Sequence, residues 1–273
     1  MPIATSDFDT VRQLVYRKAG IVLEPGKEYL VESRMHPILR DNDFSDIGQL
    51  VSALHGPKAR DLESAIVEAM TTNETSFFRD HHPFETLRTD VLPPIIENNA
   101  GTRSLRVWCA ASSSGQEPYS IAMTLREHFA TPLSGWKVEI VGTDINEEML
   151  AKCDKGSYSE LEINRGLPAM MMVKYFQRMG LQWQVKPELR SMMTFRKMNL
   201  VETWSGLGRF DVVFLRNVLI YFDADTKRKI LAQLKTVLNP GATLFLGGAE
   251  TVINFADDYE ICRLGRTVVY RVR

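Results

Sequence analysis

The sequence has few of the residues that build disulfide frameworks and metal centres. Only three cysteines occur among the 273 residues, at Cys109, Cys153 and Cys262, and none has CxxC spacing. Neither a disulfide framework nor a cysteine metal site is therefore expected. The five histidines show no HExxH pattern, which argues against a zinc enzyme. No apolar run reaches the roughly 18 residues of a membrane-spanning helix, so we expect no membrane insertion.

An excess of charge of one sign is also missing. The 33 Lys and Arg residues nearly balance the 34 Asp and Glu residues, which gives a formal net charge of -1. A protein whose main partner is nucleic acid usually carries an excess of basic residues, so nucleic acid is not an expected partner. The N-terminus shows no charged-then-apolar signal pattern, and the expected location is the cytoplasm.

What the sequence does contain is the composition of an ordinary globular protein. Hydrophobic residues make up 44% and charged residues 25%, and 273 residues suffice for one large domain and a smaller one. Up to about residue 70, apolar residues at three- and four-residue spacing predict an all-helical part. Its helical segments read FDTVRQLVYRKAGIVL, KEYLVESRMHPILRD, FSDIGQLVSALHG and DLESAIVEAM.

From Ser104 onward the pattern changes to short apolar strands separated by amphipathic helices. The strands read SLRVWC, WKVEIVG, FDVVFL and ATLFLGG, and their continuous apolar character is typical of strands buried on both faces. This alternation predicts an α/β fold with a doubly wound parallel sheet. The clearest helix runs from about Asp223 to Leu238, and a strand hairpin that turns at Gly265 closes the chain.

One region does not follow this alternation. Residues from about 170 to 199 contain strand-like stretches joined by a glycine turn and a proline turn. They leave no room for another strand–helix–strand unit. We interpret them as a small inserted antiparallel β-subdomain.

The first predicted strand runs into a turn of small residues, in the stretch RVWCAASSSGQEPYSIAM. In a doubly wound sheet, ligands bind outside the carboxyl ends of the strands, over a turn of this kind. Small side chains let a ligand approach the backbone, and Gly115 can adopt a positive φ. The helix that follows carries Glu117 in its first turn, and the next strand ends in Asp144.

These two acids favour a particular kind of cofactor. Asp144 is placed to accept hydrogen bonds from the hydroxyls of a ribose. Glu117 would repel a pyrophosphate but would suit a cationic ligand, and S-adenosylmethionine carries a sulfonium and an ammonium group. Each residue alone also has a structural reading, Glu117 as a complement to the helix dipole and Asp144 as a helix cap. Together, at the two turns of one strand–helix–strand unit, they favour a bound cofactor.

Several motifs of the sequence resemble those of a known family. The motifs that carry the resemblance are TTNETSFFRD (71–80), RVWCAASSSGQEPYSIAM (106–123), VGTDIN (141–146), MNL (198–200) and FLRNVLIYFD (214–223). In this order, over nearly the whole chain, they resemble the bacterial chemotaxis receptor methyltransferases, the CheR family. One departure is Gln116, where the family usually has an acid.

The resemblance implies a fold, a cofactor and a reaction. The fold would comprise an N-terminal helical domain (1–72) and a Rossmann-like methyltransferase domain (73–273) that contains the β-subdomain. The cofactor would be S-adenosylmethionine, and the acceptor would be the γ-carboxylate of particular glutamates on the cytoplasmic helical region of methyl-accepting chemotaxis receptors. The products would be a glutamate methyl ester and S-adenosylhomocysteine.

The resemblance also implies roles for individual residues. Arg79 and Tyr221 would face the transferred methyl group as the catalytic residues, although an Arg79–Asp80 surface ion pair and a core role for Tyr221 are the structural alternatives. The implied cofactor-binding residues are Asn73, Thr75, Arg79, Ala111, Glu117, Asp144, Asn199, Leu200, Arg216 and Asn217. No metal ligand is expected. A glutamate acceptor is already ionised at neutral pH, so no general base is required either.

Substrate docking and two other functions remain open. Lys27, Arg34 and Arg40 on the second predicted helix could meet an acidic receptor surface, as that helix does in the family. The turn around Gly180 is shorter than the Gly-rich loop with which some family members bind a pentapeptide at the receptor C-terminus, so we predict independence from that tether. The other functions are an adaptor that senses a nucleoside ligand and a methyltransferase for a small molecule or nucleic acid.

Overall fold

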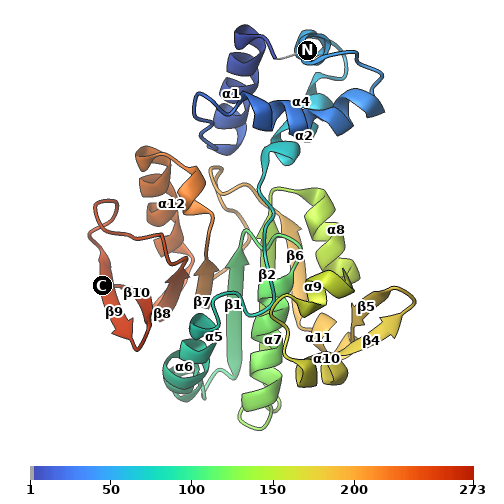
Figure 1. Ribbon diagram of the computed structural model, residues 1–273. Helices are drawn as coiled ribbons and strands as arrows, with labels where there is room; N and C mark the ends of the chain where they lie inside the picture. The colour runs from blue at the N-terminus through green and yellow to red at the C-terminus, as the bar shows by residue number, and fades with distance from the viewer. Residues whose placement is uncertain (1–2) are drawn as a thin grey trace. The chain divides into compact units, whose positions relative to one another are not determined.

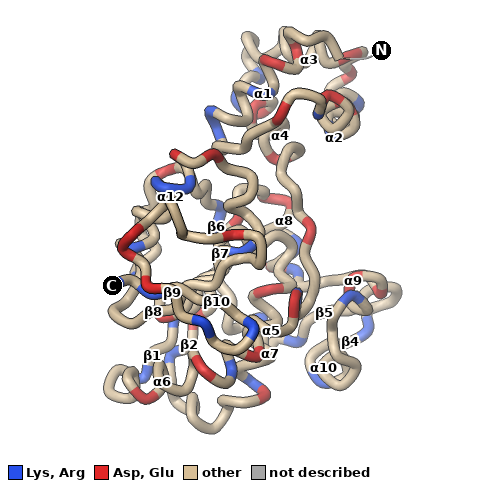
Figure 2. Tube along the Cα trace, turned by 60° about the vertical axis from the view of Figure 1, so that its left-hand side comes forward, with Lys and Arg blue, Asp and Glu red and all other residues tan. Residues whose placement is uncertain are grey.

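The computed structural model describes residues 3–273, which form two compact units. The first unit contains the residues up to Thr72 together with the short segment Tyr221–Lys227, and the second contains Asn73–Ile220 and Arg228–Arg273. Figure 2 shows acidic and basic residues interspersed along the trace of both units. This distribution matches the near balance of charges in the sequence.

The first unit is helical, as the sequence predicts. Its helices are α1 (Thr5–Ala19), α2 (Glu28–Asp41), α3 (Ile47–Ala53) and α4 (Ala59–Met70). In α1 the buried residues Phe8, Val11, Val15 and Ala19 follow one another at intervals of three or four positions, which places them on one face. Gly20 ends this helix in the left-handed conformation, and its N–H donates to the Tyr16 carbonyl at 2.8 Å.

The segment Tyr221–Lys227 joins the first unit through hydrogen bonds to residues around the end of α1. The Val22 N–H donates to the Tyr221 carbonyl at 2.9 Å. The Tyr16 hydroxyl donates to a carboxylate oxygen of Asp223 at 2.6 Å. The helical unit therefore includes residues from the distant FLRNVLIYFD motif as well as its own helices.

Arg34 of α2 is engaged inside the first unit. Its guanidinium donates to the carbonyls of Met70 and Thr71, both at 2.8 Å, and to the Thr72 hydroxyl at 3.0 Å. The last carbonyls of a helix have no partner within the helix, so these bonds satisfy the end of α4. Arg34 thus holds the segment that follows α4, and its expected contact with a receptor stays a prediction.

The second unit is built on a seven-stranded sheet with the order β6-β2-β1-β7-β8-β10-β9. Its strands are β1 (Ser104–Ala110), β2 (Lys137–Asp144), β6 (Met193–Lys197), β7 (Phe210–Leu215), β8 (Leu238–Leu246), β9 (Tyr259–Leu264) and β10 (Thr267–Val272). Strands β6, β2, β1, β7 and β8 pair in parallel, whereas the hairpin β9–β10 adds antiparallel strands at one edge. The predicted doubly wound fold, its strands and the closing hairpin are confirmed.

Strand β1 lies where the strand order reverses, because the chain continues to β2 on one side and β7 pairs on the other. Helix α7 (Gln116–His128) connects β1 to β2 and packs on β2, and α8 (Glu147–Lys155) packs on β2 and β6 (Figure 1). Helices α5 (His82–Thr86) and α6 (Leu92–Asn98) also belong to the second unit, as does α12 (Ala224–Thr236) from Arg228 onward. A crossover point of this kind is where open α/β sheets bind ligands.

The second unit also contains a small antiparallel sheet of three strands in the order β3-β5-β4. Its strands are β3 (Ser157–Ser159), β4 (Phe176–Met179) and β5 (Gln182–Val185), and the short helices around it are α9 (Glu160–Asn164), α10 (Ala169–Tyr175) and α11 (Pro187–Arg190). The expected β-subdomain is present, but its extent differs from 170–199. The sheet already begins at Ser157, and Met193–Lys197 pairs in parallel with β2 of the large sheet.

Candidate cofactor and active site

The turn after β1 has a strained backbone. Ala111 and Ser113 adopt positive φ angles of 63° and 49°, and Gly115 has a φ of 95°. Glycine accommodates this region easily, but alanine and serine do so at a cost of about 1–3 kcal/mol each. The sequence suggested that Gly115 alone would take this conformation. Strain of this kind gathers at ligand-binding turns and needs support from the surrounding structure.

Asp144, at the end of β2, supplies part of that support. Its side chain is buried and accepts hydrogen bonds from the Ser113 N–H at 2.8 Å and the Asn146 N–H at 3.0 Å. These bonds tie the end of β2 to the turn after β1. The residue that caps the following helix is Asn146 and not Asp144, so the helix-cap alternative for Asp144 is not observed; its carboxylate instead fixes the turn after β1.

Glu117 and Arg216 form a buried ion pair beneath the same turn. A guanidinium nitrogen of Arg216 lies 2.8 Å from the Glu117 carboxylate, and the two side chains are only 1% and 12% exposed. Burial raises the pKa of Glu117 above its ordinary value of 4.5, although Arg216 opposes the shift. The helix-dipole reading of Glu117 is incomplete, because the carboxylate has a specific cationic partner from the far end of β7.

Arg216 also connects to the segment 73–81. It donates to the Asp80 carboxylate at 2.6 Å and to the Arg79 carbonyl at 3.3 Å. Phe78, Asp80 and His81 all have positive φ angles, so this segment is strained like the turn after β1. Arg216 therefore holds together a loop and a helix from two motifs that the sequence analysis placed at the cofactor site.

Arg79 and Asn73 are positioned within that segment by local contacts. The Arg79 guanidinium donates to the Glu74 carbonyl at 2.9 Å. The Asn73 carbonyl accepts a hydrogen bond from the Ser113 hydroxyl at 2.8 Å, which brings the segment to the turn after β1. Asp80 pairs with Arg216 and not with Arg79, so the structural alternative of an Arg79–Asp80 ion pair is not observed.

Asn199 and Leu200 follow β6 and lie beside the end of β2. The Met198 N–H donates to the Asp144 carbonyl at 2.8 Å, which brings the MNL motif next to the proposed ribose site. The Trp204 indole N–H donates to the Leu200 carbonyl at 3.2 Å. The Trp204 ring also packs edge-on against Trp108, with ring centres 5.0 Å apart. Trp204 was not singled out from the sequence, because a single tryptophan in a polar connection carries no periodic signal.

Glu250 is a second residue that the sequence analysis missed. Its buried carboxylate accepts backbone N–H bonds from Asn217 at 2.7 Å, Val218 at 2.9 Å and Gly247 at 2.6 Å. Asn217 has a φ of 58°, so the loop after β7 is strained and Glu250 holds it in place. A Cβ on Gly247 would lie 2.6 Å from the Glu250 carboxylate, which explains the glycine there.

The structure brings most of the predicted cofactor residues into one neighbourhood of the second unit. Asn73, Glu117, Asp144 and Arg216 are linked through the turn after β1, and Asn217 follows Arg216 directly. Tyr221 belongs to the first compact unit, whereas Arg79 belongs to the second, so the pairing of these two side chains stays a prediction. Thr75 lies in the same segment as Asn73 and Arg79, and Ala111 lies in the turn after β1; their roles at the cofactor site stay predictions.

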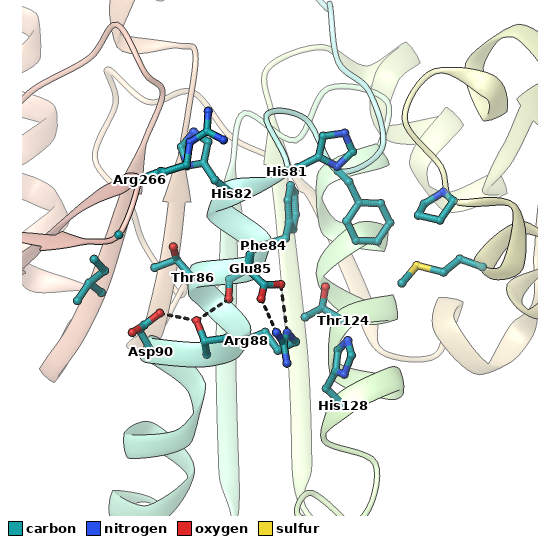
Figure 3. Close-up of a pocket in the computed structure, with 16 residues that line it drawn as sticks. His81, His82, Phe84, Glu85, Thr86, Arg88, Asp90, Thr124, His128 and Arg266 are labelled. Carbon is teal, nitrogen blue, oxygen red and sulfur yellow. Dashed lines mark hydrogen bonds and ion pairs between the residues drawn. The ribbon is translucent and has the colours of Figure 1, made fainter.

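A hollow of about 610 Å³ lies in the second unit (Figure 3), and Phe78 and His81 of the segment 73–81 are among its lining residues. Phe84 contributes to its lining, and His82 and Arg266 lie together at one side. The ring nitrogen Nδ1 of His82 is 2.8 Å from the Thr267 hydroxyl, and partial burial lowers the pKa of this histidine below 6.5. None of the predicted cofactor residues lines this hollow.

A doubly wound sheet with two acids at its first crossover defines the class of nucleoside-cofactor-binding α/β proteins. Comparison with family models then identifies the family. Residues 6–71 match the CheR methyltransferase all-alpha domain, and residues 73–268 match the CheR methyltransferase SAM-binding domain. The chain belongs to the CheR methyltransferase family and is an S-adenosylmethionine-dependent methyltransferase, as the sequence motifs predict.

Full-length relatives support the same assignment. The chain is 42% identical to "Chemotaxis protein methyltransferase 1" of Pseudomonas aeruginosa and 41% identical to "Chemotaxis protein methyltransferase Cher2" of Pseudomonas putida, in each case over 100% of both chains. It is 35% identical to the "Chemotaxis protein methyltransferase" of Escherichia coli, over 92% of this chain and 86% of that protein. The relation therefore covers both the helical part and the cofactor-binding part.

Metal-binding clusters and membrane-spanning helices are both absent from the described residues. Within residues 3–273, no group of three or more His, Cys, Asp and Glu side chains has an arrangement that could hold a metal ion. No described helix is both long enough and apolar enough to cross a bilayer. The expectation that the reaction uses no metal stays a prediction.

Proposed function

We propose that this protein transfers a methyl group from S-adenosylmethionine to the γ-carboxylate of specific glutamates on methyl-accepting chemotaxis receptors. The products are a glutamate methyl ester and S-adenosylhomocysteine, and the reaction takes place in the cytoplasm on the helical methylation region of the receptor. The observation that carries the proposal is a pair of acids on either side of one strained turn, of which Asp144 is buried and the Glu117 side chain is 12% exposed. Two acids at a helix N-terminus and a strand end suit a nucleoside cofactor that carries positive charge.

The residues present fit this cofactor. The Nε atom of Arg216 is buried without a hydrogen-bond partner among the described residues, so a ligand that brings an acceptor would satisfy it. The carboxylate of the methionine moiety is such an acceptor, and Glu117 would bind the neighbouring ammonium group. Asp144 would bind the ribose hydroxyls, and Asn199 and Leu200 would contact the adenine.

The main task of the protein in this reaction is to position the methyl donor and the acceptor. S-adenosylmethionine supplies a methyl group that is activated by a positively charged sulfur. The acceptor glutamate, with an ordinary pKa of about 4.3, is already anionic at neutral pH. The protein has to hold the acceptor oxygen about 3 to 3.5 Å from the reacting carbon. Arg79 would orient this carboxylate through paired N–H donors, and Tyr221 would add a hydrogen bond or shape the opening.

Incubation with methyl-labelled S-adenosylmethionine and receptor-containing membranes tests the proposal. We expect label on the receptor that mild alkali releases, because carboxyl methyl esters are labile to base. Cofactor binding without any turnover would instead identify an adaptor that senses a nucleoside ligand. Label on a small molecule or on nucleic acid, with none on the receptor, would identify a different methyltransferase.

The affinity for S-adenosylmethionine should depend on pH through Glu117. Because the folded-state pKa of Glu117 is raised, protonation removes its negative charge at a higher pH than in the unfolded chain. Affinity should therefore fall as the pH is lowered through this raised pKa, while the stability contributed by Glu117 increases in the same direction. Calorimetric titrations from about pH 8 to about pH 5 would measure the slope. The Glu117→Gln variant should bind more weakly at high pH and show a flatter profile; an identical slope in both proteins would count against the assignment.

We further propose that the enzyme does not need a receptor C-terminal pentapeptide. In the small sheet only Gly180 and Leu181 connect β4 to β5, which supports the short turn that the sequence suggested. Titration of such a peptide into the protein should give no saturable heat, with a pentapeptide-binding family member as the positive control. Saturable binding comparable to that control would refute independence from the tether.

A further inference from the structure

Tyr158 connects the small antiparallel sheet to the turn after β1. It is the central residue of β3 and its side chain is fully buried. Its hydroxyl donates a hydrogen bond to the Ser114 carbonyl at 2.8 Å. A residue of the small sheet therefore contacts the backbone of the turn that would hold the cofactor.

The Tyr158 hydroxyl lies so close to Gly115 that the turn has no space for a side chain at this position. A Cβ added to Gly115 would lie 2.9 Å from the Tyr158 hydroxyl, closer than real Cβ contacts. Burial raises the pKa of Tyr158 well above 10, so the phenol stays protonated and remains a donor at physiological pH. Because the turn itself is strained, a fixed donor on its outer side helps to keep the carbonyl of Ser114 in place.

Tyr158 also contacts the second segment of the proposed site. Its ring packs edge-on against Phe77, with ring centres 5.1 Å apart and an interplanar angle of 77°. Phe77 packs in turn against Phe176 of β4, with ring centres 5.5 Å apart. Phe77 lies in the TTNETSFFRD motif, close to Arg79. One side chain of the small sheet thus contacts both segments that approach the cofactor.

We propose that Tyr158 is a positioning residue for the cofactor, and that the small sheet thereby fixes the geometry of the cofactor turn. Tyr158 acts through the Ser114 carbonyl and the Phe77 ring, and it does not itself contact the cofactor. This role rests on the proposed binding of S-adenosylmethionine at the turn. It gives the small sheet a part in cofactor binding that is separate from any contact with a receptor.

The chain offers a matched control in Tyr119. This tyrosine is also fully buried, and its hydroxyl also donates to a backbone carbonyl at 2.8 Å, but the acceptor is Cys153 in α8. Its ring centre is 6.3 Å from that of Tyr158, so the two phenols share an environment. The Tyr158→Phe and Tyr119→Phe variants each remove one hydroxyl from this environment, and only the first removes a bond to the turn.

Calorimetry with S-adenosylhomocysteine on the full-length variants tests the proposal. Tyr158→Phe should weaken binding about 5- to 10-fold, where tenfold corresponds to about 1.4 kcal/mol. It should raise KM for S-adenosylmethionine while kcat at saturating cofactor stays near that of the wild type. Tyr119→Phe should bind within about twofold of the wild type, although thermal denaturation should show a similar fall in Tm for both variants.

Three other results would overturn the positioning role of Tyr158 or the proposed function. Unchanged affinity in Tyr158→Phe, with binding by the wild type, overturns the positioning role alone. Equal weakening in Tyr119→Phe also overturns it, because the bond from Tyr158 to the turn would then have no effect of its own. Absence of binding by the folded wild type overturns the proposed function, and the role of Tyr158 with it.

Discussion

Replacement of Asp144 by alanine is expected to weaken the binding of S-adenosylhomocysteine by about 100-fold or more. The substitution removes the proposed acceptor of two ribose hydroxyl bonds, each worth about 1.5–3 kcal/mol when the acceptor is charged. A loss of about 3 kcal/mol corresponds to roughly 100-fold in affinity. It also releases the Ser113 N–H, which Asp144 holds at 2.8 Å. Calorimetric titration would measure the change.

Asp211 provides a matched control for this experiment. Asp144 and Asp211 are each 7% exposed. Asp211 accepts hydrogen bonds from the Arg106 N–H at 2.8 Å and the Asn239 side chain at 2.8 Å, near the start of β7 and away from the crossover turn. The Asp211→Ala variant should lose stability but keep its affinity for the cofactor. Equal affinity in Asp144→Ala and the wild type would remove Asp144 from the site.

Replacement of Arg216 by methionine is expected to abolish methyl transfer and to lower the free energy of unfolding by about 3–5 kcal/mol. The substitution leaves the buried Glu117 carboxylate without its cationic partner at 2.8 Å and removes the bond to Asp80. The Asp80 pair should contribute less, because the Asp80 side chain is 45% exposed. Chemical denaturation would measure the loss. The difference from the wild type should shrink as the pH is lowered, because the unpaired Glu117 then takes up a proton.

The double variant Glu117→Gln, Arg216→Met separates the buried charge from the loss of packing. Once Glu117 is neutral, the penalty for burying an unpaired charge disappears, so the double variant should be more stable than Arg216→Met. Both variants should lack methyltransferase activity. A double variant that is no more stable than Arg216→Met would show that the ion pair is not the main source of the loss.

Much of the fold could be predicted because its signals are local. Continuous apolar runs marked the strands that became β1, β2, β7 and β8, and three- and four-residue spacing marked the helices of the first unit. The extent of the β-subdomain was the error. The stretch Met193–Lys197 looks like any short strand, and only its partner, β2, shows that it belongs to the large sheet.

Some residues of the proposed site could be inferred from the sequence and others could not. Asp144 and Glu117 could be inferred from their place after a strand and at the start of a helix. Glu250 and Tyr158 could not, because each acts on backbone groups 33 to 44 residues away in the sequence, at Asn217 and Ser114. The hydrogen bonds of Arg34 at the end of α4 could not be inferred from the sequence either, and its contact with a receptor stays a prediction.

The sequence by itself determined the class of fold and the family, and it led to the turn proposed to hold the cofactor, because these depend on periodicity and on motifs that are contiguous in the chain. Only the tertiary structure decided which side chains support that turn, such as the ion pair of Arg216 with Glu117 and the hydroxyl of Tyr158. The physical reason is that periodicity reports which face of an element is buried, whereas the partner on the other side of a contact depends on sheet order and register.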